Sequence, residues 1–142
     1  TGAMSPAEYA AWWLEVLEPG AIDILILQDG VGTGRASPEL AGQYLAELGP
    51  SVEAVGVELW SVAELFHQLH GSPIDNRPFA AVPIDPAMLR HSLAIEAPLV
   101  EHVVAFAVLD YMDPRRGGAA RRLYDDYTTT CRVAGSPWRT PC

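Results

Sequence analysis

Short apolar segments alternate along this chain with segments that carry helix start signals, and this alternation limits the possible folds most. Residues 21–27 (AIDILIL) are rich in Ile and Leu, are too short for a stable helix and end at Asp29-Gly30. Residues 79–84 (FAAVPI) predict another strand, the third along the chain if residues 53–59 form the second. The nearly all-apolar segment 100–109 fits either a strand buried on both sides or a helix buried all round.

Four segments carry helix signals. Ser5-Pro6-Ala7-Glu8 combines an N-cap, an N1 proline and a capping-box glutamate, and predicts a helix over about 6–18. Ser37-Pro38 begins a second helix, which Gly49-Pro50 is expected to end. Asp85-Pro86 caps a short third helix, and a fourth is expected over about 118–127.

Segment 51–70 allows two interpretations. Its apolar residues fit a heptad on one long helix, but residues 54–59 also alternate in the way a strand does. Gly56 costs a helix interior about 1 kcal/mol, so we favour a strand over 53–59 followed by a helix over 60–70.

These patterns predict a single α/β domain over residues 1–142, with a Rossmann-like parallel sheet and flanking helices. A mostly helical bundle is the alternative. Residues 1–3 resemble a cloning remnant, and residues 115–142 form a basic helix and tail, which we expect to dock on the body or on a neighbouring subunit.

Composition excludes several classes of function. The chain of 142 residues has a net charge of −9 and contains no lysine, which argues against pyridoxal phosphate, Schiff-base and Walker-A chemistry. The acidic body argues against nucleic acid, and the apolar stretches are too short to span a membrane. Cys131 and Cys142 are too few and too near the end for a disulfide framework, so we expect a cytoplasmic protein, as a homodimer or as a partner subunit.

A glycine-rich loop follows the first predicted strand and precedes a helix. Gln28-Asp29-Gly30-Val31-Gly32-Thr33-Gly34 is a context in which backbone amides can approach a nucleotide closely. The dinucleotide fingerprint does not fit, because Arg35 and Ser37 stand where it needs Gly or Ala. Taken alone, such a loop is more often only a turn.

With three later features, this loop resembles the Rossmann-like class I S-adenosylmethionine-dependent methyltransferases over about residues 28–114. The later features are the segments VGVEL (55–59), VPID (82–85) and VAFAVL (104–109). The resemblance implies a shortened small-molecule methyltransferase that binds S-adenosylmethionine through Gly30, Gly32, Gly34, Glu58 and Asp85. His102 or Asp110 is then the base that deprotonates the acceptor substrate.

Another group of residues points to different chemistry. Glu64-x-x-His67-x-x-His70 lies on the predicted helix 60–70, where residues three apart are neighbours. A second Glu-x-x-His is missing, so we predict no metal site. The alternative function is a cofactor-independent acid/base enzyme, a cyclase, lyase or isomerase of small-molecule or peptide tailoring, that uses these residues. A non-catalytic partner subunit is the remaining alternative.

Overall fold

The structure is a computed structural model that describes residues 4–17, 20 and 22–130. Its first element, α1 (Pro6–Val16), begins with the expected capping box, in which Ser5 and Glu8 bond each other's backbone amides. The predicted remnant at 1–3 and the two cysteines lie outside the described residues.

Three parallel strands form the main sheet in the order β1-β2-β5. They are β1 (Ile24–Gln28), β2 (Glu58–Glu64) and β5 (His102–Phe106). The register places Ile26 beside Trp60 and Trp60 beside His102. Their carboxyl ends therefore meet at one edge of the sheet.

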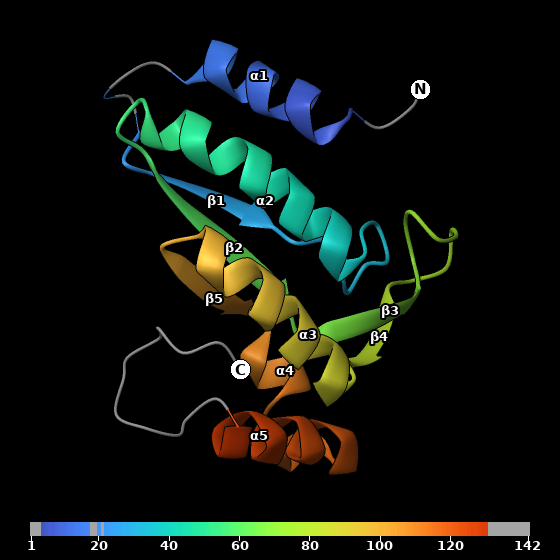
Figure 1. The fold of residues 1–142 in the computed structure, drawn as a ribbon. Helices are drawn as coiled ribbons and strands as arrows, with labels where there is room; N and C mark the ends of the chain where they lie inside the picture. The colour runs from blue at the N-terminus through green and yellow to red at the C-terminus, as the bar shows by residue number, and fades with distance from the viewer. Residues whose placement is uncertain (1–3, 18–19, 21, 131–142) are drawn as a thin grey trace.

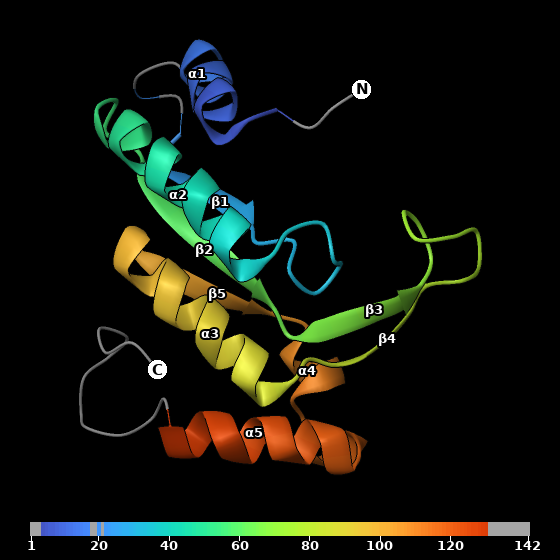
Figure 2. The same ribbon diagram turned by 45° about the vertical axis from the view of Figure 1, so that its right-hand side comes forward.

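Two long helices lie on the same side of this sheet, as both ribbon views show (Figures 1 and 2). They are α2 (Pro38–Glu53) and α3 (Pro86–Glu96). Alternate strand residues such as Leu25 and Leu59 pack toward α2, whose Leu45, Leu48 and Val52 are buried. Helix α1 covers the outer side of α2 (Figure 1). The expected end of the second helix at Gly49-Pro50 was wrong, since α2 continues to Glu53 with Pro50 in its interior.

A second apolar cluster joins α3 to the C-terminal helix α5 (Gly118–Thr130). Leu123 of α5 is fully buried there. The short α4 (Val108–Tyr111) and the 3-10 turns Ala97–Leu99 and Pro114–Arg116 connect these elements. The helix α5 packs on the body, whereas its Arg121 and Arg122 are exposed. It packs through Leu123 and through Asp126, which pairs with Arg90.

Residues 60–70 do not form the expected helix. After β2, the chain turns at Leu65 into β3 (Phe66–His70), which pairs antiparallel with β4 (Ala80–Pro83). This hairpin projects from the body beside the glycine-rich loop (Figure 2). The helix prediction was wrong because three buried strand positions carry the polar residues Ser61, Glu64 and Gln68. With polar residues inside, the sequence does not show the alternation of apolar and polar residues that is typical of a strand.

The observed architecture is a small parallel sheet with flanking helices and a hairpin, which confirms the α/β class and excludes the helical bundle. Sequential strand order is shared by several parallel folds, so the Rossmann-like assignment stays a prediction. Among the described residues, no helix is long and apolar enough to cross a membrane.

Candidate functional site

Polar and aromatic side chains gather at the carboxyl edge of the sheet. Gln28 ends β1 and Asp29 follows it, Glu64 ends β2, and Phe106 ends β5. Glu64 and Phe106 are register partners on neighbouring strands. In open parallel sheets this edge is the usual place for a ligand.

Glu64 is buried at this edge, with 1% of its surface exposed. Gln28 Nε2 donates a hydrogen bond to Glu64 Oε1, and the backbone N–H of Thr33 donates one of 2.7 Å to Glu64 Oε2. Each carboxylate oxygen therefore has its own donor, as a buried carboxylate requires.

Asp29 lies next to Glu64 and is also buried. Its Oδ1 accepts from the Val31 N–H at 3.1 Å, and its Oδ2 accepts from the Glu64 N–H at 3.4 Å. Burial raises the pKa of Asp29 to about 6; the Val31 hydrogen bond opposes this rise and the neighbouring Glu64 charge adds to it. Near neutral pH, Asp29 can therefore exchange a proton.

The glycine-rich loop binds the chain itself rather than a cofactor. The Thr33 amide is taken by Glu64, and the Gly32 carbonyl accepts from the Gln68 N–H at 2.8 Å. A Cβ added to Gly32 would lie 2.2 Å from the Phe66 carbonyl oxygen and 2.7 Å from Glu64 Cβ. Gly32 therefore allows this loop to pack against the hairpin, while Gly30 and Gly34 supply positive φ angles for its turns.

A cluster of aromatic rings includes Phe106, the register partner of Glu64. The ring of Phe66 is surrounded by those of Phe79, Phe106 and Tyr111, at centroid distances of 5.7, 6.2 and 5.3 Å. Phe66 is buried, whereas Phe79 and Phe106 expose about half of their surfaces, 56% and 50%. The carboxyl edge therefore offers aromatic surface next to hydrogen-bonding groups.

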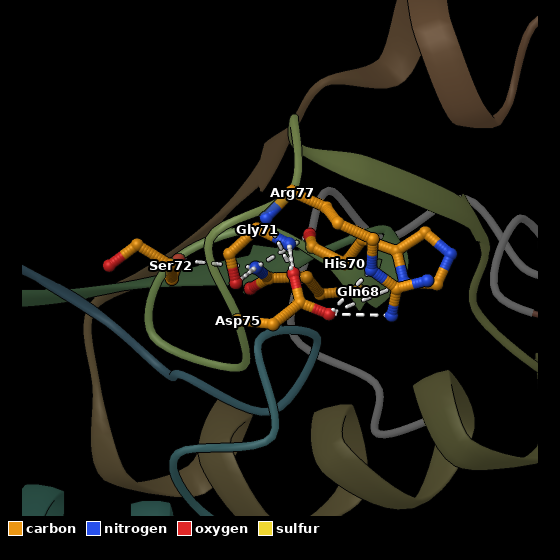
Figure 3. Close-up of polar contacts among 6 residues, drawn as sticks. All are labelled: Gln68, His70, Gly71, Ser72, Asp75 and Arg77. Atoms are coloured by element: carbon orange, nitrogen blue, oxygen red, sulfur yellow. Dashed lines mark hydrogen bonds and ion pairs between the residues drawn. The ribbon is translucent and has the colours of Figure 1, made fainter.

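The hairpin tip holds a separate polar cluster, shown in Figure 3. Gln68 Nε2 donates to the carbonyls of His70, Gly71 and Ser72, and Asp75 accepts from the Gly71 N–H at 3.0 Å. Arg77 donates to Asp75 and holds its pKa below the ordinary value. Because most of these bonds run to the tip's own backbone, the cluster fixes the shape of the loop.

Two predicted cofactor-binding residues, Glu58 and Asp85, and the predicted base His102 lie elsewhere. Glu58 begins β2 and His102 begins β5, so both stand at the amino edge, opposite the glycine-rich loop. Glu58 accepts from the Trp60 indole, whose ring lies 4.7 Å from that of His102. A surface cavity of about 340 Å³ at this end includes Glu58 in its lining. Asp85 is the N-cap of α3 and accepts from the Ala87 N–H.

The structure also separates the other predicted catalytic residues. Asp110 is exposed on α4 and pairs with Arg116. Glu64 ends β2, whereas His67 and His70 lie on β3, and His70 Nδ1 lies 3.7 Å from Asp75 instead. Within the described part of the chain, no three His, Cys, Asp or Glu residues are grouped to hold a metal ion.

A second buried glutamate was not singled out from the sequence. Glu96 ends α3 on the helix side of the sheet and is fully buried, with one hydrogen bond from the Ser61 hydroxyl. Burial raises the pKa of Glu96 to about 7, against the lowering effect of Ser61. Sequence pattern gives little signal for this residue, but Asp29 could have been found as the acid that directly follows a buried strand.

Comparison with known proteins decides the family. A family model described as a domain of unknown function (DUF4434) matches residues 1–117. The chain belongs to the DUF4434 family. No curated protein matches it.

The solved structures of known proteins include a similar fold. A crystal structure titled "putative alpha-L-fucosidase" from Bacteroides thetaiotaomicron VPI-5482 matches with a TM-score of 0.75 and 20% identity. The match covers 94% of this chain and 40% of that one, so this DUF4434 chain spans less than half the length of its structural neighbour.

These findings correct the predicted function. The matching family is not a methyltransferase family, and the similar fold is that of a protein described as a glycosidase, which does not use S-adenosylmethionine. The glycine-rich loop also has its Thr33 amide bonded to Glu64, and Glu58 lies at the opposite edge. The predictions of a methyltransferase activity and of bound S-adenosylmethionine are therefore wrong. The comparisons do not support the alternative functions either, whether cyclase, lyase, isomerase or partner subunit.

Proposed function

We propose that the carboxyl edge of the sheet is part of a sugar-binding, glycoside-processing centre. The observation that carries this proposal is the position of Glu64, whose N–H donates to Asp29 on one side and whose register partner on the other side is the half-exposed Phe106. The description of the structural neighbour as an alpha-L-fucosidase supports the same class of substrate.

The aromatic and the carboxylate side chains at this edge suit different groups of a sugar. The C–H groups of a sugar ring pack on the negative face of an aromatic ring, while its hydroxyls donate to carboxylate oxygens. Phe106 and Phe79 provide the first kind of surface. Glu64, which is 1% exposed, provides the second when a sugar hydroxyl takes the place of the Gln28 amide at its Oε1. The site therefore matches a neutral sugar better than a charged ligand.

Most glycosidases use two carboxyl groups, one that protonates the leaving oxygen and one that acts as nucleophile or base. Asp29, whose pKa is raised to about 6, is suited to the first role because it holds its proton closer to neutral pH than an ordinary aspartate. Glu64, held by Gln28 and Thr33, is suited to the second.

Calorimetric titration with L-fucose, D-galactose, D-glucose and D-mannose tests the binding step. We expect at least one sugar to bind, and Phe106→Ala to weaken this binding about tenfold, which corresponds to about 1.4 kcal/mol. Met88→Ala is the matched control, because Met88 is similarly exposed but lies on α3. If no sugar binds, or if both variants bind like the wild type, the proposal is wrong.

Hydrolysis of 4-nitrophenyl glycosides tests the chemical step in the same preparation. Where the wild type releases nitrophenol, Asp29→Asn and Glu64→Gln should each reduce kcat at least a hundredfold, while KM changes much less. If a variant keeps the wild-type kcat, the carboxyl group that it lacks takes no part in the reaction.

A further inference from the structure

The contact between α3 and β2 contains three buried polar side chains. Ser92 and Glu96 lie four residues apart on the buried face of α3, and Ser61 lies in β2. Ser61 and Glu96 expose 0% of their surfaces and Ser92 exposes 1%. The cluster is therefore internal to this domain, whatever surrounds the domain.

The hydrogen bonds of this cluster are incomplete when Glu96 is charged. The Ser61 hydroxyl donates to Glu96 Oε2. Glu96 Oε1 and Ser92 Oγ are both buried and have no partner among the described atoms. Buried polar atoms are normally hydrogen-bonded, and a buried charge with a single donor is more costly than a neutral group.

A proton on Glu96 supplies the missing donor. A carboxylic acid has one O–H donor and keeps acceptor capacity on its other oxygen. Because Oε2 accepts from Ser61, we place the proton on Oε1. Ser92 is the neighbour four residues earlier on the same helix, where side chains approach each other, and its Oγ can accept this hydrogen bond.

The charges around α3 also favour the neutral acid. Its other charged groups form two ion pairs nearer the surface: Arg90 with Asp126 of α5, and His91 with Glu39 of α2. Glu58 and Glu64 of β2 point to the opposite side of the sheet from Ser61. Burial raises the pKa of Glu96 to about 7, the Ser61 hydrogen bond opposes this rise and the charge of Asp29 adds to it.

We propose that Ser61, Ser92 and Glu96 form a buried proton-binding site, in which the protonated Oε1 of Glu96 donates to Ser92 Oγ and so holds α3 on the sheet in a pH-dependent way. Because the pKa of Glu96 is raised from 4.5 to about 7, the folded state keeps this proton in a range where the unfolded state releases it. The stabilising contact is complete below about pH 4.5 and is lost as pH rises through about 7, which loosens α3 from β2. This inference does not depend on sugar binding.

Carbon-13 NMR of the glutamate side-chain carboxyls measures the protonation midpoint of Glu96 directly, and Glu96→Gln identifies its signal. We expect a wild-type midpoint near 7. Ser92→Ala removes the acceptor of the protonated acid and should lower the midpoint by about one pH unit. Ser61→Ala removes the donor to the charged form and should raise the midpoint by about the same amount. Ser51→Ala, at a half-buried position of α2, is the matched control and should leave it unchanged.

Amide hydrogen exchange in residues 86–96 gives a second measurement, after correction for the intrinsic pH dependence of exchange. Protection of α3 should fall in the wild type as pH rises through about 7. It should stay high in Glu96→Gln, because the glutamine amide can donate to Ser92 and accept from Ser61 in the same way as the protonated acid.

Three results would overturn the proposal. The first is a wild-type midpoint close to the ordinary value of 4.5. The second is a midpoint that Ser92→Ala leaves unchanged or raises, in a variant that far-UV circular dichroism shows to be folded. The third is α3 protection that depends on pH in Glu96→Gln as it does in the wild type.

Discussion

The two faces of the sheet each contain one buried glutamate, and their surroundings differ. Glu64 at the carboxyl edge has a donor for each oxygen, from Gln28 and from the Thr33 amide. Glu96 on the helix side has one bond from Ser61, and its Oε1 has no partner among the described atoms. At Glu96, burial with a single hydroxyl donor favours the protonated acid.

Under the proposed function, this difference separates a binding group, Glu64, from a structural one, Glu96. The region around Glu64 combines backbone amides, a neighbouring acid and exposed aromatic rings. The region around Glu96 is closed by α3 and has no exposed polar neighbour of its own, since Ser61 and Ser92 are also buried. The following variants test how far the contrast holds, from the largest expected effect to the smallest.

Gly32→Ala should disrupt the loop that carries the Glu64 donors. Its Cβ would lie 2.2 Å from the Phe66 carbonyl oxygen, which is backbone and cannot move cheaply. We expect a loss of about 3 kcal/mol or more in the free energy of unfolding, measured by urea denaturation. Gly49→Ala in α2 is the control: its Cβ would make only ordinary contacts, 3.8 Å to the Leu99 carbonyl oxygen and 3.9 Å to Leu59, so a gain of about 0.5–1 kcal/mol is expected. Equal effects would contradict the packing argument.

Glu64→Ala should leave the Thr33 N–H and the Gln28 amide without an acceptor. An unsatisfied buried donor costs about 1–3 kcal/mol, so we expect a loss of about 2–3 kcal/mol in the same denaturation experiment. Glu58→Ala, at the exposed amino end of the same strand, should change stability by less than about 0.5 kcal/mol. A Glu64→Ala variant as stable as Glu58→Ala would show that the Glu64 hydrogen bonds contribute little.

Glu96→Gln should act in the opposite direction. Because the pKa of Glu96 is raised from 4.5 to about 7, the folded state binds an extra proton between these values. Its contribution to stability is complete below about pH 4.5 and is lost as pH rises through about 7. The neutral variant should therefore be more stable than the wild type by about 1–3 kcal/mol at pH 8 and similar to it at pH 4.5. Denaturation curves at both pH values measure this, and an unchanged difference between them would contradict it.

Asp75→Ala should have the smallest effect on global stability, below about 1 kcal/mol, since the hairpin tip is remote from both apolar clusters. Loss of the acceptor for the Gly71 and Arg77 amides should nevertheless increase amide hydrogen exchange in residues 71–79. Protection that stays as high as in the wild type would mean that other contacts hold the tip.

Local signals in the sequence predict where the three capped helices begin. Ser5, Ser37 and Asp85 each cap a helix at the expected residue, because a short oxygen-bearing side chain followed by proline acts through neighbouring amides alone. The first and last strands of the sheet are also found near their expected positions.

The residues at the carboxyl edge of the sheet could not be predicted from local sequence signals. The second strand was expected over 53–59 but runs from Glu58 to Glu64, which moves Glu58 from the carboxyl edge to the amino edge. Ser61 and Glu64 conceal the strand because their partners, Glu96 and Thr33, are distant in the chain. Tertiary hydrogen bonds allow polar residues in buried positions, and a pattern of hydrophobicity does not show them.

The most direct test of the central claim is an amide NMR titration of the protein with L-fucose and the other three sugars. The account predicts shifts at the Thr33 amide and in Phe106, with the Trp60 indole N–H at the amino edge unchanged. Shifts confined to Trp60 and its neighbours, or no shift with any of the four sugars, would contradict a sugar site at the carboxyl edge.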